Sequence, residues 1–208
     1  GRSKGKPVVF IEHTFIHNFT EHKSQSIKRF SNVRDYTRDM LNMARAYRSC
    51  KNVSWAAELK NMFIDMYKNM HYYGWAAGSG LGTLHHLGYG FRNYYGALFL
   101  MREALQQAGL RQQAQEDMYW YSGCGKIHEP FEKSGYANID ILNTTAMGQL
   151  ASVLMIENKQ QRQSELYAYQ RWLNLGLDVA PGLKAPLKAD GSLYHHYNHY
   201  TLYGRDAL

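Results

Sequence analysis

Val33-Arg-Asp-Tyr-Thr-Arg-Asp-Met-Leu-Asn-Met-Ala-Arg-Ala-Tyr-Arg-Ser49 is the stretch that decides the fold class. Its apolar residues recur at intervals of three and four, the period of one face of an α-helix. Residues 53–72 repeat the pattern after a short break. Two long amphipathic helices with a short link predict helices packed on helices. The apolar positions are Val33, Tyr36, Met40, Met43, Ala44 and Tyr47, then Trp55, Leu59, Met62, Phe63 and Met66.

Further helices are predicted along the rest of the chain, and Gly109 and Gly176 are natural helix ends. The short apolar run Pro7–Ile11 is the one segment that favours an extended strand. We therefore expect an all-α fold of paired helices joined by long loops. The predicted helices are 91–108, 112–122, 139–157 and 160–176, and the predicted loops are 74–90, 122–138 and 177–200.

Composition and charge narrow the class of protein. The 208 residues are 45% apolar, enough for one sizeable domain with a core. The 24 Lys and Arg outnumber the 17 Asp and Glu, so the net charge of +7 attracts polyanions. The basic residues are scattered, so nucleic-acid binding is not specifically indicated, and no apolar run is long enough to predict a membrane span. The polar start at 1–6 has no signal-peptide core.

The two cysteines, Cys50 and Cys124, form no metal-binding CxxC pattern. Their spacing fits either two buried thiols or one disulfide, and both readings stay open.

The segment Asp190–Leu208 contains three His and four Tyr residues. Imidazole titrates near neutral pH, and a phenol can carry a proton when its pKa is lowered, so the composition favours a proton-transfer site. The histidines at 195, 196 and 199 also allow a metal site. His195 and His199 have the i, i+4 spacing of zinc ligands, but no Glu lies between them, so we expect no metal and no other cofactor.

Two other motifs carry candidate site residues. Gly82-Thr-Leu-His-His-Leu-Gly-Tyr-Gly-Phe-Arg92 precedes an apolar helix and fits a ligand-facing loop or a plain loop equally well. The second motif is Ser134-Gly-Tyr-Ala-Asn-Ile-Asp140. Its Asn138 could simply cap the predicted helix that follows.

Three pieces together resemble the chondroitin ABC lyases of polysaccharide lyase family 8. They are His85–Arg92, the helix Asn93–Leu105, and Asp190–Tyr203, which contains an Asp-Gly-(x)3-His-His segment. The resemblance runs from about residue 30 to residue 208. It implies a lead-in segment at 1–30, followed at 31–208 by part of a catalytic domain. That domain would be an incomplete α/α toroid built of antiparallel helical hairpins.

The resemblance also implies an activity, which is β-elimination on uronate-containing glycosaminoglycans. A His followed seven residues later by a catalytic Tyr corresponds to His196 and Tyr203, and Asn138 matches an Asn that neutralises the uronate carboxylate. Asn143 is a nearby substitute for it. The family's catalytic Arg and its β-rich domains would lie beyond Leu208. The residues that would bind substrate are His85, His86, Tyr89, Arg92, His195 and Tyr200.

Two other function classes compete with a lyase that degrades chondroitin, dermatan or hyaluronan. One is a non-catalytic glycosaminoglycan-binding helical module, and the other is a metal-dependent hydrolase centred on residues 195–199. The resemblance further implies a secreted or periplasmic bacterial enzyme whose partners are its acidic polysaccharide substrate and its own remaining domains.

Overall fold

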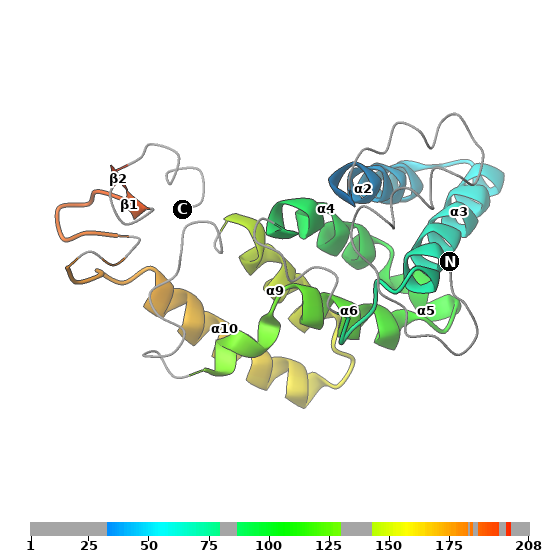
Figure 1. Cartoon of the computed structure of the whole chain (residues 1–208). Coiled ribbons are helices and arrows are strands. Elements are labelled where there is room, and N and C mark those ends of the chain that lie inside the picture. Colours follow the sequence, from blue (N-terminus) through cyan, green and yellow to red (C-terminus); the bar gives the residue numbers. More distant parts are fainter. Residues whose placement is uncertain are drawn as a thin grey trace, which may run out of the picture. The chain divides into compact units, whose positions relative to one another are not determined.

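The computed structural model describes residues 33–79, 87–129, 143–182, 184, 187–195 and 199–200 (Figure 1). The chain forms two compact units, residues 1–117 and 118–208, which are treated separately below. Within the described ranges the elements are helical apart from one two-residue ladder and isolated bridges, which confirms the predicted all-α class. Every helix in these ranges is too short or too polar to cross a lipid bilayer.

The N-terminal unit begins with the predicted pair of helices, α2 (Val33–Ser49) and α3 (Val53–Tyr72). The side chain of Asn52 accepts a hydrogen bond from the Trp55 N–H at 3.1 Å and so caps α3. Then follow α4 (Leu87–Leu100), α5 (Arg102–Gln107) and α6 (Arg111–Tyr121), whose residues up to 117 belong to this unit.

The predicted helix 91–108 is two helices that meet at Met101. At this junction the Arg102 guanidinium donates to the Phe99 carbonyl at 2.9 Å and lies 4.6 Å from the centre of the Phe99 ring. This contact lies at the junction, while the helical hydrogen bonds from the Met101 N–H to the Ala97 carbonyl and from the Leu105 N–H to the Met101 carbonyl are kept.

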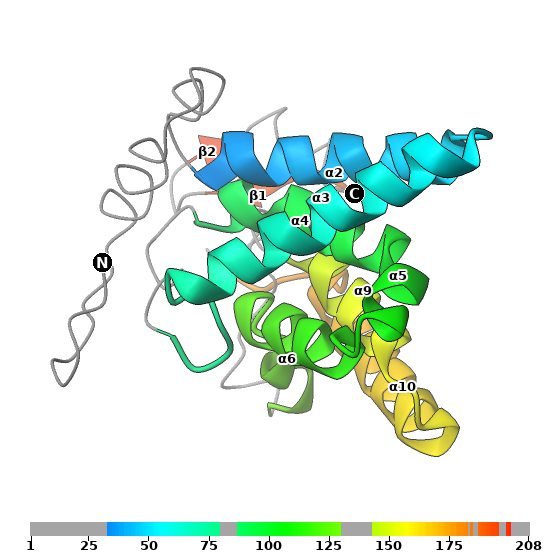
Figure 2. The ribbon, with the colours of Figure 1, turned by 90° about the vertical axis from the view of Figure 1, so that its right-hand side faces the viewer.

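Helix α4 also begins at Leu87 rather than at residue 91, because Gly90 serves helix packing. Helix α2 lies along α4, and Figure 2 shows the two side by side. The Thr37 hydroxyl donates to the Gly90 carbonyl at 2.6 Å. A Cβ atom at Gly90 would stand only 2.8 Å from Val33 Cγ1. Tertiary contact therefore outweighs the low helix propensity of glycine.

Aromatic side chains fill the core of this unit. Trp75 is fully buried and stacks on Phe91, with ring centres 5.3 Å apart. Phe91 in turn meets Tyr94 edge to face at 5.0 Å. Such pairs add about 0.5–1.5 kcal/mol beyond the burial of their area. Since Trp75 belongs to the loop after α3, this stack anchors that loop on α4.

The C-terminal unit is built on a 3-10 helix, η2 (Cys124–His128), and on α9 (Ala146–Met155) and α10 (Lys159–Gly176). Asn158 caps α10 by accepting from the Gln161 N–H at 2.9 Å. These three helices share one apolar cluster, and the Tyr169 hydroxyl donates to the Ala146 carbonyl at 3.1 Å. The buried members are Cys124, Ile127, Ala146, Val153, Ile156, Tyr169 and Trp172.

Cys50 and Cys124 are free thiols, so the structure favours the unpaired alternative. Cys124 is buried in the cluster of the C-terminal unit, and burial raises the pKa of its thiol to about 12. A thiol that stays protonated at neutral pH is a packing group rather than a nucleophile.

Gly90→Ala should destabilise the protein relative to Gly96→Ala. Both changes add a methyl group to α4, but at Gly96 the added Cβ would lie an ordinary 3.4 Å from Leu41 Cδ1. At Gly90 it would press on the stiff, β-branched Val33. We expect a difference in unfolding free energy of about 1–3 kcal/mol between the variants, measured by urea denaturation.

The double variant Gly90→Ala, Val33→Ala is the matched control, because it removes the methyl group that clashes. It should recover part of the difference. Equal stability of the two single variants would contradict a close approach of α2 and α4 at Gly90.

Candidate active site

Five predicted site residues lie outside the described parts of the chain: His85, His86, Asn138, His196 and Tyr203. The structure therefore leaves their placement as a prediction. The other four, Tyr89, Arg92, His195 and Tyr200, lie in described elements, the first two in the N-terminal unit and the last two in the C-terminal unit.

Tyr89 and Arg92 lie near the start of α4, three residues apart. Residues at i and i+3 are neighbours on a helix surface, so the structure brings these two positions together. Tyr89 is half-buried and Arg92 is exposed. Between them lies Gly90, which packs against α2, so the α2–α4 contact sets the rotation of α4 about its axis. The direction in which Tyr89 and Arg92 project is fixed by the same contact.

His195 and Tyr200 lie in a short antiparallel ladder formed by β1 (Tyr194–His195) and β2 (His199–Tyr200). Tyr194 pairs with Tyr200 and His195 pairs with His199. The sequence predicted a loop here, and the difference has a simple cause. A strand of two residues is too short for an alternating pattern to show. The ladder fixes the backbone on both sides of residues 196–198, among which is the predicted catalytic His196.

The chain reaches this ladder through a turn that Asp190 stabilises. Its carboxylate accepts from the Ser192 N–H at 2.9 Å and from the Ser192 hydroxyl at 2.6 Å. These bonds lower the pKa of Asp190, the hydroxyl bond most. An exposed carboxylate held in its ionised form orders a turn and is a poor proton donor.

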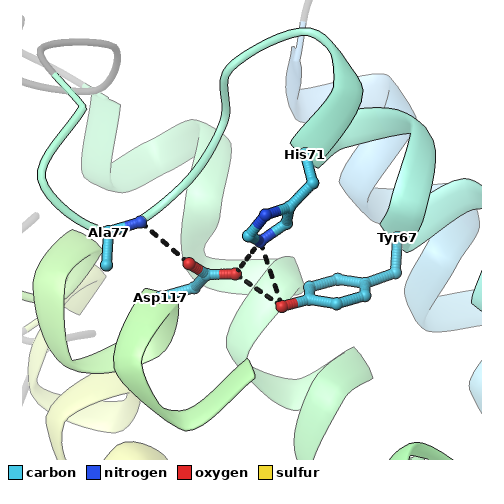
Figure 3. Close-up of polar contacts among 4 residues, drawn as sticks. All are labelled: Tyr67, His71, Ala77 and Asp117. Carbon is cyan, nitrogen blue, oxygen red and sulfur yellow. Dashed lines mark hydrogen bonds and ion pairs between the residues drawn. The ribbon is translucent and has the colours of Figure 1, made fainter. Parts of the chain in front are cut away.

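A polar cluster that sequence reasoning missed lies in the N-terminal unit (Figure 3). The carboxylate of Asp117 on α6 is 1% exposed. Its Oδ2 accepts from the Tyr67 hydroxyl at 2.6 Å and lies 2.5 Å from His71 Nε2. Its Oδ1 accepts from the Ala77 N–H at 2.8 Å. The cluster thus joins the C-terminal turns of α3, the loop after α3, and α6.

The electrostatics of the cluster favour a structural role over proton transfer. Burial, and next the negative charge of Asp117, raise the pKa of the Tyr67 phenol well above its usual value. Tyr67 therefore stays a donor. Both carboxylate oxygens of Asp117 are already occupied by hydrogen bonds. The cluster can hold helices and a loop together, but it is poorly suited to take a proton from a sugar.

The loop after α3 is therefore held at two points, by the Trp75 ring on Phe91 and by the Ala77 N–H on Asp117. Gly74 and Gly78 lie on either side of these points, both with positive φ, at 90° and 82°. That backbone region is open to glycine at little cost. The spacing of Tyr67 and His71, four residues apart on one helix, was the signal that could have located the cluster.

The metal alternative rests on His195, His196 and His199, whose side chains lie outside the described residues. Among the side chains that are described, no group of three His, Cys, Asp or Glu is close enough to hold a metal ion.

Comparison with known proteins identifies relatives over the whole chain. A family model described as "Lyase, catalytic" matches residues 1–208. A chondroitin sulfate ABC exolyase of Bacteroides thetaiotaomicron is 34% identical over 151 residues, which are 73% of this chain and 15% of the relative. An exolyase of the same name from Proteus vulgaris is 38% identical. The match covers 65% of this chain and 14% of the length of that relative.

A third relative, the chondroitin sulfate ABC endolyase of Proteus vulgaris, is 30% identical. The match covers 100% of this chain and 21% of the length of the endolyase. The chain thus spans 14–21% of the length of these relatives. The relatives thus include both exolyases and an endolyase.

Asp117→Asn should lower the unfolding free energy by about 2–4 kcal/mol, because an amide can no longer accept on both sides and the Tyr67 and His71 groups lose a charged partner. Glu116→Gln is the matched control, since this neighbour on α6 is exposed and its carboxylate accepts from the Gln112 side chain at 3.0 Å. We expect it to change stability by less than about 0.5 kcal/mol. Thermal denaturation of both variants measures the difference, and similar melting temperatures would contradict the role of the cluster.

Proposed function

The chain belongs to the lyase catalytic-domain family, and we propose that it is part of an enzyme that cleaves uronate-containing glycosaminoglycans by β-elimination. The observation that carries this proposal is the family match over residues 1–208, and chondroitin sulfate lyases are among the relatives. The substrates would be chondroitin and dermatan sulfate, with hyaluronan as a further candidate.

The chemistry requires a base, an acid and a group that neutralises a carboxylate. The base removes the proton from C5 of the uronate, and the electron pair of that C–H bond forms the C4–C5 double bond. The C4–O bond then breaks, and an acid protonates the departing oxygen. The C5 proton is acidic enough only when hydrogen bonds neutralise the adjacent carboxylate.

His196 and Tyr203 would supply the proton transfer. Tyr203 would act as base, acid or both, and His196 would assist proton removal or hold the uronate carboxylate. Asn138 would donate a hydrogen bond to that carboxylate, with Asn143 as its nearby substitute. The β1–β2 ladder supports this assignment, because it gives the residues that flank 196–198 in the sequence a paired backbone rather than a free loop.

The anionic polymer would be bound by the loop and helix start that carry His85, His86, Tyr89 and Arg92, and by His195 and Tyr200. The exposed Arg92 and the net charge of +7 support attraction of sulfated or uronate groups. Attraction of this kind is weakened by salt, so substrate binding should be sensitive to ionic strength.

The proposal extends to the organisation of the enzyme. Residues 31–208 would form part of an α/α toroid built of helical hairpins, preceded by the lead-in segment 1–30. The remaining domains of the same enzyme would complete the site, including a catalytic Arg, in keeping with the small share of the relatives that this chain covers. The enzyme would work outside the bacterial cytoplasm, where polysaccharides of this kind are met.

Tyr203→Phe should reduce turnover by at least about a hundredfold, the usual size of a general acid–base contribution. The change removes the phenolic proton carrier and keeps the ring, so binding of the polymer should be largely retained. The measurement is the rate of ultraviolet absorbance gain on chondroitin sulfate, with the full enzyme. Near-normal turnover would contradict the assignment of Tyr203.

His196→Ala should be about as severe, and His195→Ala should be milder. His196 has the spacing to Tyr203 that the family pattern requires, whereas His195 is expected to contact the substrate. Turnover and KM of the two variants are compared in the same assay. If the His195→Ala variant were inactive and the His196→Ala variant active, the catalytic role would belong to His195 and not to His196. Unchanged turnover in all three variants would contradict the assignment of proton transfer to His196 and Tyr203, whereas polymer binding without turnover in the wild-type enzyme would favour a non-catalytic binding module.

A further inference from the structure

Lys188 has an unusual set of contacts in the approach to the β1–β2 ladder. Its ammonium donates to the carbonyl of Gly182 at 2.7 Å, to the carbonyl of Ala180 at 3.3 Å, and to the carbonyl of Lys184. It also lies 4.9 Å from the centre of the Tyr194 ring. An ammonium group has three N–H donors, and three carbonyl oxygens meet it here. The Lys188 ammonium is therefore bound by backbone carbonyls of its own chain.

The backbone around Lys188 is hydrogen-bonded as well. The Lys188 N–H donates to the Ser192 carbonyl, and the Gly191 N–H donates to the Lys188 carbonyl, both at 2.9 Å. The Ala180 N–H donates to the Leu187 carbonyl at 2.8 Å. Bridges pair Leu187 with Val179 on one side and with Leu193 on the other. Segment 179–182 is thereby tied to 187–193, and residue 193 is followed directly by β1.

The cation is needed for this arrangement because three carbonyl dipoles point their negative ends at one place. Without a positive charge they repel each other, and the Ala180 carbonyl, whose bond is partly buried, loses a charged hydrogen-bond partner. The Tyr194 ring adds a cation–π contact, and Tyr194 is itself 4% exposed. The ammonium therefore links the loop at 180–184 to the first residue of β1.

We propose that Lys188 is a positioning residue for the proton-transfer pair, an inference that rests on the proposed function. By holding the carbonyls of Ala180, Gly182 and Lys184 near Tyr194, its ammonium fixes the orientation of β1, the strand that precedes the predicted catalytic His196 in the sequence. A displacement of about 1 Å in a catalytic group can cost up to about a hundredfold in rate. Lys188 touches no substrate in this account, so it acts on turnover and leaves polymer binding unchanged.

The test is Lys188→Met in the full enzyme, which keeps the length of the aliphatic stem and removes the ammonium. We expect kcat on chondroitin sulfate to fall at least tenfold while KM stays within about twofold, at a temperature where circular dichroism shows the variant folded. Lys184→Met is the matched control. It removes an equal charge from the same loop but leaves the Lys184 carbonyl in place, and its kcat should stay within about twofold of wild type.

Lys188→Arg is a second variant for the case in which Lys188→Met does not fold. Its planar guanidinium keeps the charge but directs its donors as a flat fork, so it cannot meet three converging carbonyls in the same way. Its kcat should also fall, with KM unchanged. Wild-type kcat in either Lys188 variant overturns the proposal, and so does a rise in KM at constant kcat, or an equal loss in Lys184→Met. A wild-type enzyme that forms no unsaturated product contradicts the proposed function itself.

Discussion

The close approach of α2 to α4 is the constraint on which the N-terminal unit depends. It is possible only because residue 90 has no side chain, so that Val33 and the Thr37 hydroxyl can lie directly against the α4 backbone. The same helix carries Tyr89 and Arg92 on its opening turns and Phe91 in the core, where Trp75 stacks on it. Packing and the predicted substrate contacts are therefore set by one helix–helix contact, and a change that rotates α4 would move both.

Each unit also contains a charged side chain whose hydrogen-bond partners lie in the same unit. In the N-terminal unit the buried Asp117 carboxylate gathers donors from α3 and from the loop after it. In the C-terminal unit the Lys188 ammonium gathers carbonyls from the 180–184 loop. A charge taken out of water, as that of Asp117 is, is tolerated only where its partners are complete. In both places the partners order a stretch of chain that precedes predicted site residues in the sequence. Residues 75–79 precede His85 and His86, and residues 187–193 precede the β1–β2 ladder.

Much of the fold could be predicted from the sequence, because long amphipathic helices with three- and four-residue spacing leave little choice of structure. The bounds of α2 and α3 agree with the prediction, and α6 and α10 begin one residue earlier than predicted. The start of α4 could not be predicted, since Gly90, which is typical of a loop, is used here for helix packing. The break at Met101, the ladder at Tyr194–Tyr200 and the Asp117 cluster depend on single side chains or on contacts between distant residues, which no local pattern contains. The roles of His196, Tyr203 and Asn138 come from family resemblance and remain predictions.

Product analysis with the full wild-type enzyme tests the central claim most directly. Chondroitin, dermatan sulfate and hyaluronan would be incubated separately, and the ultraviolet absorbance and the masses of the oligosaccharide products recorded. β-Elimination leaves a double bond at the new non-reducing end, so the account predicts a growing ultraviolet absorbance and products that lack one water compared with those of hydrolysis. Saturated products that carry the added water would establish a hydrolase and contradict the account, and binding of the polymers without any new product would leave only a carbohydrate-binding role.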